Sequence, residues 1–387
     1  MTHSTDIIEV AENILMCPGS KKGNAYFTPQ SSGCYAIRED DTVFVIDSGA
    51  GANQRDMIIQ AVKRIKGDAE KLVLINTHAH VDHICNNKYI MEIEGFQSKH
   101  HYLHESGKCC LDPYNYYLSL HQEIDRYYDI FEGPPPPWRL ITRILSLGSR
   151  DKQLKKMVEK ALKKFGDIEP SRETIEYLQD KDSCIFKFDN CRVDELKMSA
   201  DAVSINLGPL EVKGWDLHGA QVFANGGHSP DHILVYFPKK KFLAAGDLTL
   251  EMFPIFPKHS SEKTIIEKLE LVQELAKEEM IEILADGHHG KIFKGGKAIL
   301  ELLENILTLH ESFKDALISC FDKEKGETIK SLYRKLRKLR YDIPAVDFHL
   351  ENQFPAAPIF LKTIICALLL EMGAKIEGSG DKAVFYL

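Results

Sequence analysis

The chain has 387 residues, of which 44% are hydrophobic and 27% are charged, and its formal net charge is −8. These values are ordinary for a globular protein with one large domain or two smaller ones, and the negative charge disfavours nucleic acid as the main partner. No apolar run has the length of a membrane span, and the N-terminal residues lack the core of a signal peptide. The nine cysteines contain no CxxC pair, so we expect reduced thiols in a cytoplasmic protein.

The first part of the chain predicts strands that alternate with helices. Residues 5–47 have the pattern of short strands in succession, with a charged hairpin turn at 38–41. Residues 53–66 carry apolar side chains at helical spacing, and residues 71–75 form an apolar run typical of a buried strand. We expect a further helix over about 86–98 and a short strand within 99–105.

Residues 112–195 differ in character, because they are rich in aromatic and charged side chains and predict helices. One of these helices ends at a glycine that is followed by four prolines, 134–137. We interpret the segment as a helical insertion that forms a lid, with Tyr117, Tyr128 and Trp138 lining an apolar substrate pocket. The alternative is that these aromatic side chains only pack the helices together.

Strand patterns return near residue 204 and alternate to residue 246, followed by a helix over 260–278 and a strand within 280–286. The tail from 296 is mostly helical and ends in a helix and a short hairpin. Its basic run, 333–340, has leucines at helical spacing, which favours the exposed face of a helix over a nucleic-acid patch. We therefore expect four parts: two halves of one domain, an insertion between them, and a C-terminal region, at 1–111, 196–308, 112–195 and 309–387.

The sequence THAHVDH places three histidines and one aspartate within six residues, directly after the apolar run 71–75. In an extended loop His78 and His80 point to the same side, and a turn can bring Asp82 and His83 to a second position nearby. Imidazole and carboxylate side chains are ligands for zinc, iron and manganese. Because one metal needs three or four ligands, further ligands must come from elsewhere in the chain.

Three later segments supply candidates, each where an apolar run gives way to a loop. His228 lies in GGHSPDH and Asp247 lies in AAGD. In DGHHG either His288 or His289 fits, and the position directly after the glycine favours His288. Because strand ends gather at one edge of an open α/β sheet, we expect these side chains to meet there.

The segments VFVIDSG, THAHVDH, GGHSPDH, AAGD and DGHHG occur in the order typical of the metallo-β-lactamase superfamily, which the chain resembles over residues 8–110 and 200–300. The resemblance implies an α/β fold, the αββα sandwich of that family, with the metal site at its open edge. It implies that Asp47 is the buried aspartate that orients a ligand histidine. The implied ligands form two sets with a shared carboxylate: His78, His80 and His228 for the first metal, Asp82, His83 and His288 for the second, and Asp247 as the bridge.

The chain departs from this family's pattern at two places, and its tail resembles the winged-helix-like region of some superfamily hydrolases. Family members commonly read DHIGGN, whereas Cys85 and Asn86 stand at the two glycine positions here. Cys85 either packs in the interior or faces the metals. Asp231 and His232 follow GGHSP where the family usually has glycine. We expect a surface turn at these two residues, with contacts to ligand residues or substrate as the alternative.

This site predicts a metal-dependent hydrolase. Two divalent ions, with zinc preferred and iron or manganese as alternatives, would share a hydroxide that is available at neutral pH, and Asp82 and Asp247 are the catalytic candidates. The aromatic insertion favours a small ester-type substrate with an apolar part, such as a thioester or lactone. A phosphodiesterase or nuclease and a mononuclear-iron sulfur dioxygenase stay as alternatives, and the sequence leaves open whether the chain forms a homodimer.

Overall fold

The computed structural model describes residues 6–19, 32–110, 130–131, 193–224, 226–249, 261–288, 291–322, 324–340, 342–344, 346 and 357–387. Most of the expected insertion, residues 112–195, lies outside these ranges. The candidate pocket residues Tyr117, Tyr128 and Trp138 lie outside them too, as does His289.

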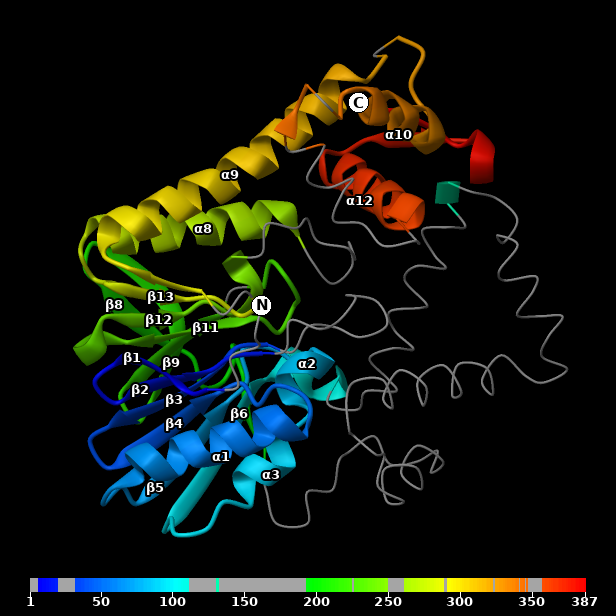
Figure 1. Cartoon of the computed structure of the whole chain (residues 1–387). Helices are drawn as coiled ribbons and strands as arrows, with labels where there is room; N and C mark the ends of the chain where they lie inside the picture. The colour runs from blue at the N-terminus through cyan, green and yellow to red at the C-terminus, as the bar shows by residue number, and fades with distance from the viewer. Residues whose placement is uncertain are drawn as a thin grey trace, which may run out of the picture.

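The first of two facing sheets is built from the N-terminal part of the chain (Figure 1). Its strands, in spatial and chain order, are β1 (Ile8–Ala11), β2 (Ile14–Cys17), β3 (Cys34–Glu39), β4 (Thr42–Ile46), β5 (Lys71–Ile75), β6 (Ser98–His104) and β7 (Val193–Leu196). The sheet is mixed, because β1 to β4 pair antiparallel and β4 to β7 pair parallel. β7 begins at Val193, inside the range expected for the insertion, so the chain has returned to the first sheet before residue 196.

The second sheet follows in the chain and faces the first. Its strands are β8 (Val203–Leu207), β9 (Leu210–Leu217), β10 (Ala220–Ala224), β11 (Ile233–Phe237), β12 (Phe242–Ala244), β13 (Ile283–Ala285) and β14 (Ile292–Lys294). It is also mixed, since only β12 and β13 pair parallel while the other neighbours pair antiparallel.

Helices cover the outer faces of both sheets (Figure 1). The helices are α1 (Ala52–Lys66), α2 (Val81–Ile84), α3 (Asn87–Met91), α8 (Glu262–Lys277), α9 (Gly296–Ser319), α10 (Ile329–Lys338) and α12 (Ala357–Glu371), with 3-10 turns η1 (Glu105–Cys110), η2 (Pro238–Lys240), η3 (Gly246–Thr249) and η4 (Gly380–Lys382). α1 and α3 pack on the first sheet, and α8 and α9 pack on the second. None of the helices in the described ranges combines the length and apolar composition needed to cross a bilayer.

Alternate side chains of the central strands explain this layering. In β4, Phe44 faces the second sheet, whereas Val43 and Val45 pack against α1. In β11, Phe237 likewise faces inward, and its ring lies edge-on to Phe44 with 5.0 Å between centroids. A strand whose two faces are both buried needs apolar residues at consecutive positions, as the runs VFVI and ILVYF have. The expected αββα sandwich is therefore confirmed.

The C-terminal region has a hydrophobic core formed by the end of α9, by α10 and α12, by Phe131 and by Phe385 of β16 (Val384–Tyr386), which pairs with the exposed strand β15 (Lys375–Glu377). Leu332 and Leu336 of α10 are buried in it, while Arg334, Arg337 and Lys338 are exposed, so the part of the basic run up to Lys338 is the exposed face of a helix, as expected. α9 runs through the expected boundary at 308/309, because its first half packs on α8 and its second half enters the C-terminal core.

The tight packing between the two sheets implies that a cavity there should lower the free energy of unfolding. Replacing Phe44 by alanine should lower the free energy of unfolding by about 3–5 kcal/mol, because the side chain is fully buried between the sheets. Guanidinium chloride unfolding measures this, and Val203→Ala on a 52% exposed side chain is the control, with a change within about 0.5 kcal/mol. Equal losses in the two variants would contradict the assigned inner face.

Candidate metal site

The first sheet contributes the ligand candidates of the THAHVDH motif. His78 and His80 lie in the segment that leaves β5, and His80 is the residue that precedes α2. α2 is a single helical turn that carries Asp82 and His83, closed by the His83 backbone N–H donating to the His80 carbonyl at 2.9 Å. The expected turn after the two histidines is thus helical, and it points consecutive side chains at the same place.

The second sheet contributes the remaining candidates from three strand ends. His228 lies in the loop between β10 and β11, Asp247 lies in η3 after β12, and His288 follows β13. The structure brings all seven candidates into two groups: His78, His80, His228 and Asp247 in one, and Asp82, His83 and His288 in the other. Within each group the potential ligand atoms all lie within 4.8 Å of one another.

In the first group, nitrogen and oxygen atoms face each other at short range. His228 Nε2 lies 3.0 Å from His80 Nδ1 and 3.3 Å from Asp247 Oδ2. His78 Nε2 lies 3.7 Å from the same carboxylate oxygen. Three imidazoles and a carboxylate from both sheets thus converge on one position, which is a donor set suited to a divalent ion.

The second group shares Asp247 with the first. His288 Nε2 lies 3.2 Å from Asp82 Oδ2 and 3.4 Å from His83 Nε2. Asp247 Oδ2 is 3.1 Å from His288 Nε2, and Asp247 Oδ1 is 3.3 Å from His83 Nε2. The carboxylate of Asp247 therefore faces both groups, which is the geometry that a bridging ligand requires.

Buried atoms without partners provide a test of whether these residues fit a metal. His78 Nε2 and Asp247 Oδ1 are buried and make no hydrogen bond of good geometry among the described residues, although His83 Nε2 lies 3.3 Å from Asp247 Oδ1. Unpartnered buried polar atoms are rare in folded proteins, and each needs a physical explanation. Divalent ions between the two groups would satisfy both atoms, so the side chains present fit such ions.

The electrostatics of the site agree with this fit. Burial, reinforced by the neighbouring imidazoles, lowers the pKa of His78 and His80 well below the usual value and keeps both rings neutral, as ligands must be. Burial opposes ionisation of Asp247, but His288 and His83 hold the pKa of its carboxyl well below the usual range. Burial also opposes the charge on His288, yet Asp247 and Asp82 raise the pKa of His288 to about 9. The carboxylates thus require positive charge beside them, which metal ions would supply in place of protons.

Asp47 fixes the orientation of two ligand candidates from below. His83 Nδ1 lies 2.8 Å from Asp47 Oδ2, and because a carboxylate only accepts, His83 donates here and turns Nε2 toward the site. Thr77 donates its backbone N–H to Asp47 Oδ1 at 2.7 Å and its hydroxyl to Oδ2 at 2.8 Å. The Thr77 hydroxyl oxygen also lies 3.1 Å from His78 Nδ1, which extends the same orientation to His78. Asp47 thus contacts His83 directly and reaches His78 through Thr77.

The expectation of a surface turn at Asp231 and His232 is wrong, since both side chains are buried. Asp231 Oδ2 accepts the backbone N–H of Ala79, the residue between His78 and His80, at 2.7 Å. His232 Nε2 accepts the backbone N–H of Asp247 at 3.0 Å, and burial lowers the pKa of His232 to about 3. These two side chains hold the backbone of the ligand segments, and the only sequence signal for them was polarity directly before a buried strand.

The residues at the family's glycine positions need no glycine here. Cys85 and Asn86 have φ values of −60° and −101°, which any residue adopts. Asn86 donates through Nδ2 to the carbonyls of Ser48 and Gly51 at 2.9 and 3.2 Å and so ties this turn to the loop after β4. Cys85 is partly buried and belongs to neither ligand group, and burial raises the pKa of its thiol.

Glycine is required instead beside the second-sheet ligands. Gly246 has φ 51°, and a Cβ there would lie 2.6 Å from His232 Nε2. A Cβ on Gly287 would lie 2.6 Å from Asp247 Oδ1. The glycines of AAGD and DGHHG therefore let two backbone segments approach the bridging carboxylate.

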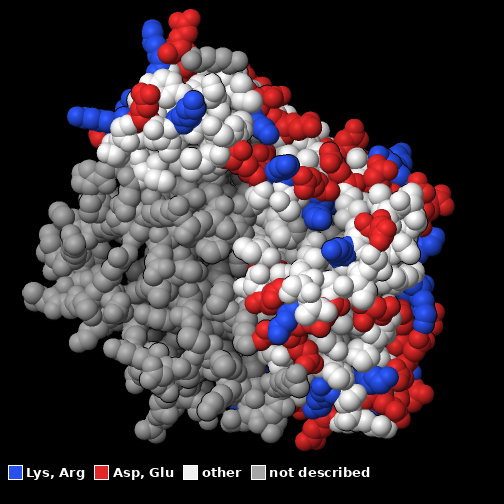
Figure 2. All heavy atoms as spheres, turned by 180° about the vertical axis from the view of Figure 1, so that it is seen from behind, with Lys and Arg blue, Asp and Glu red and all other residues white. Residues whose placement is uncertain are grey.

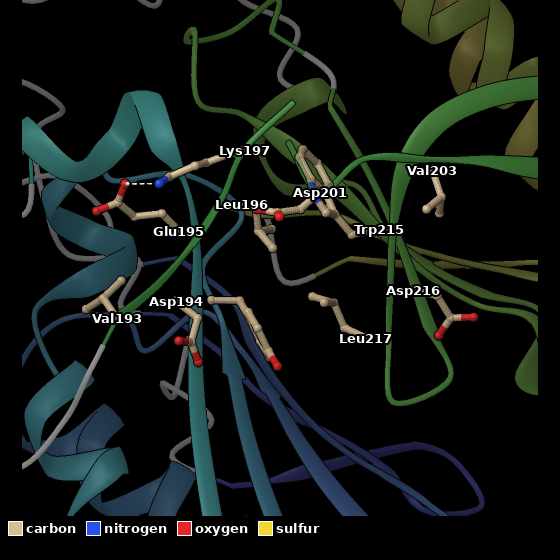
Figure 3. A pocket seen from close by; sticks show the side chains of 11 residues that line it. Val193, Asp194, Glu195, Leu196, Lys197, Asp201, Val203, Trp215, Asp216 and Leu217 are labelled. Atoms are coloured by element: carbon tan, nitrogen blue, oxygen red, sulfur yellow. Dashed lines mark ion pairs between the residues drawn. The ribbon is translucent and has the colours of Figure 1, made fainter. Parts of the chain in front are cut away.

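A separate pocket of about 600 Å³ lies at the edge of the sandwich (Figure 3). It is lined by residues of β6, β7 and β9, among them Tyr102, Asp194 and Trp215. Lys197 and Glu195 point toward one another across its rim and form an ion pair of 4.0 Å. None of the metal-ligand candidates lines this pocket, so it is distinct from the site described above.

Residues 27–281 match the family model described as "Metallo-beta-lactamase superfamily". The fold is similar to a metallo-beta-lactamase family protein from Thermus thermophilus (14% identity, TM-score 0.53, covering 98% of this chain and 99% of that chain) and to a beta-lactamase domain protein from Burkholderia ambifaria (14%, 0.58, 100% and 95%). It is also similar to the stereoselective inverting sec-alkylsulfatase Pisa1 from Pseudomonas sp. (11%, 0.51, 94% and 49%). No curated protein matches the chain.

The role of Asp231 can be tested through metal retention. Asp231→Ala should weaken the binding of a divalent ion by about 10–100-fold, because the segment between His78 and His80 loses its anchor. Competition with a chromophoric chelator at pH 7 measures the change, and Asp216→Ala on an exposed residue of β9 is the control. Wild-type retention in Asp231→Ala would show that the loop holds its geometry without this contact.

Proposed function

The chain belongs to the metallo-β-lactamase superfamily, and we propose that this hydrolase uses two divalent metal ions to cleave an ester-type substrate, with a thioester or lactone as the favoured class. The observation that carries the proposal is the position of Asp247, whose carboxylate faces both ligand groups at 3.1–3.3 Å. One group alone would support a single metal, whereas a shared carboxylate supports a pair.

We assign the ligands as the sequence predicted, and the convergence of the side chains supports the assignment. His78, His80 and His228 would hold the first ion, and Asp82, His83 and His288 would hold the second, with Asp247 between them. The histidine-rich donor set favours zinc, with iron and manganese as alternatives.

The chemistry follows from what this donor set can hold. Two divalent ions held by these residues would lower the pKa of a water molecule toward about 7 and would act as Lewis acids on a substrate carbonyl or phosphoryl oxygen. Asp82 and Asp247 are the carboxylates of the two groups and are 7% and 4% exposed. We propose that these carboxylates would accept a proton from attacking water and return it to the leaving group, without a serine or cysteine nucleophile.

The substrate class rests on features outside the ligand groups. The aromatic residues of 112–195 support an apolar acyl portion, as a thioester or lactone would have. Figure 2 shows Lys and Arg interspersed with Asp and Glu over the described part of one face, which gives no support to a nucleic acid as substrate. The likeness to an alkylsulfatase concerns the fold, so a secondary alkyl sulfate belongs in the substrate panel beside thioesters, lactones and bis-aryl phosphodiesters.

The cysteines bear on the compartment. Cys17 and Cys34 lie directly opposite one another on β2 and β3, and both are buried free thiols. We propose a cytoplasmic location on the sequence pattern, because the nine cysteines are scattered and form no CxxC pair.

Removing a ligand should separate catalysis from folding. His80→Ala and Asp247→Asn should each lower turnover by about a thousandfold or more, because several kcal/mol of metal assistance is lost. The measurements are steady-state rates on the substrate panel, metal content by atomic emission, and circular dichroism. His100→Ala and Asp216→Asn, both outside the two ligand groups, are the matched controls. Activity that survives in His80→Ala with a native spectrum would rule out the two-metal mechanism.

The substrate-pocket proposal has a test of its own. We expect a KM for acyl substrates about tenfold higher in each of the variants Tyr117→Ala, Tyr128→Ala and Trp138→Ala, because each change removes apolar area from the proposed substrate pocket. Metal content should stay at the wild-type level. The ratio of kcat/KM for a long-chain and a short-chain thioester measures the preference. If this ratio does not move in any of the three variants, the aromatic residues serve packing alone.

A further inference from the structure

The loop that carries His228 rests on the first turn of α8. The backbone N–H of Ser261, the residue before α8, donates to the carbonyl of Gly227 at 2.8 Å. A Cβ on Gly227 would lie 2.6–2.9 Å from the side chain and backbone of Ile265, so the loop backbone lies flat against the helix. Because His228 is the next residue, its position follows the position at which α8 begins.

The start of α8 is in turn held by a residue of the C-terminal region. Glu371, the last residue of α12, accepts the Ser261 hydroxyl at 2.6 Å through Oε1. The same carboxylate accepts the backbone N–H groups of Glu262 at 3.2 Å and Lys263 at 3.1 Å. These N–H groups belong to the first turn of α8, where backbone N–H groups have no acceptor within the helix itself. The helix dipole also stabilises a negative charge at this end of the helix.

The other ligand candidates are held by different groups. His83 and His78 are oriented by Asp47 and Thr77, and the backbone of Asp247 is held by His232. Among the described residues, His228 is the ligand candidate whose loop backbone is hydrogen-bonded to the start of α8. The turn η3, which carries Asp247, also packs on α8, but the backbone N–H of Asp247 is held by His232. A change at the start of α8 therefore acts first on the His228 position.

We propose that Glu371 is a positioning residue for the metal site, which sets the place of His228 through the N-terminus of α8. The inference rests on the proposed two-metal function, because it concerns the affinity of the first of the two ions. It makes the C-terminal region part of the hydrolytic site: α12 and α8 meet end to end at this carboxylate, although α12 lies in a separate hydrophobic core (Figure 1).

The test is a zinc competition titration with a chromophoric chelator on the full-length chain. In Glu371→Ala, one of two zinc equivalents should bind about tenfold more weakly while the other keeps its wild-type affinity. Glu371→Gln keeps an acceptor oxygen without the charge, so its affinity for the weakened zinc equivalent should lie between those of the wild type and Glu371→Ala. Glu304→Ala, on an exposed residue of α9, is the matched control and should equal the wild type.

Two further measurements distinguish positioning from a general structural role. In the cobalt-substituted protein, the absorption of one cobalt site should change in Glu371→Ala and the other should not. Adding Glu371→Ala to His228→Ala should cause no further loss of zinc affinity, because Glu371 acts through His228.

Each outcome decides a separate claim. Wild-type protein that binds no zinc would overturn the proposed function. Wild-type protein that binds two equivalents, with Glu371→Ala indistinguishable from Glu304→Ala, would overturn this inference alone, as would an equal weakening of both equivalents. If Glu371→Ala unfolds below the assay temperature, Glu371→Gln decides: one-site weakening supports the inference, and wild-type affinity overturns it.

Discussion

A buried carboxylate between two groups of imidazoles is the constraint on which the rest of this structure depends. Asp247 is 4% exposed, and moving an isolated carboxylate from water to such a position is costly unless positive charge accompanies it. The ring nitrogens of His83, His228 and His288 surround it at 3.1–3.3 Å. The compensating positive charge comes either from protons on several of these rings or from metal cations among them. Metal cations would both stabilise the buried carboxylate and supply the Lewis acids that hydrolysis needs.

The two-sheet sandwich places the ligand candidates around Asp247. β5, β12 and β13 end at the same edge, and each strand passes directly into a segment that carries ligand candidates. Residues on the two inner faces, such as Phe44 and Phe237, lock the sheets together, so the two halves of the site keep a fixed separation. Asp47 and Asp231 act at the next level, since each ties a ligand-bearing segment to a neighbouring element. A site assembled from both sheets is therefore as rigid as the core beneath it.

Within the described residues, the alternation of strands and helices, the two buried sheets and the meeting of the ligand segments could be predicted from the sequence, although the helix expected over 86–98 is only α3, Asn87–Met91. Periodicity reveals strands such as β5, and chemistry-bearing side chains at strand ends must gather at one edge. The burial of Asp231 and His232 could not be predicted, because both side chains accept hydrogen bonds from backbone N–H groups, those of Ala79 and Asp247. Every residue except proline has such a group, so no pattern of side chains in the sequence indicates these contacts. The helical form of the single turn α2 could not be predicted either, since four residues are too few to show a helical period.

The most direct test of the central claim is anomalous diffraction from crystals of the protein grown with zinc, measured above and below the zinc absorption edge. Our account predicts two anomalous peaks, one on each side of the Asp247 carboxylate, with His78 and His80 beside one and Asp82 and His83 beside the other. A map with no peak between these groups, or with a single peak that Asp247 does not contact, would contradict it.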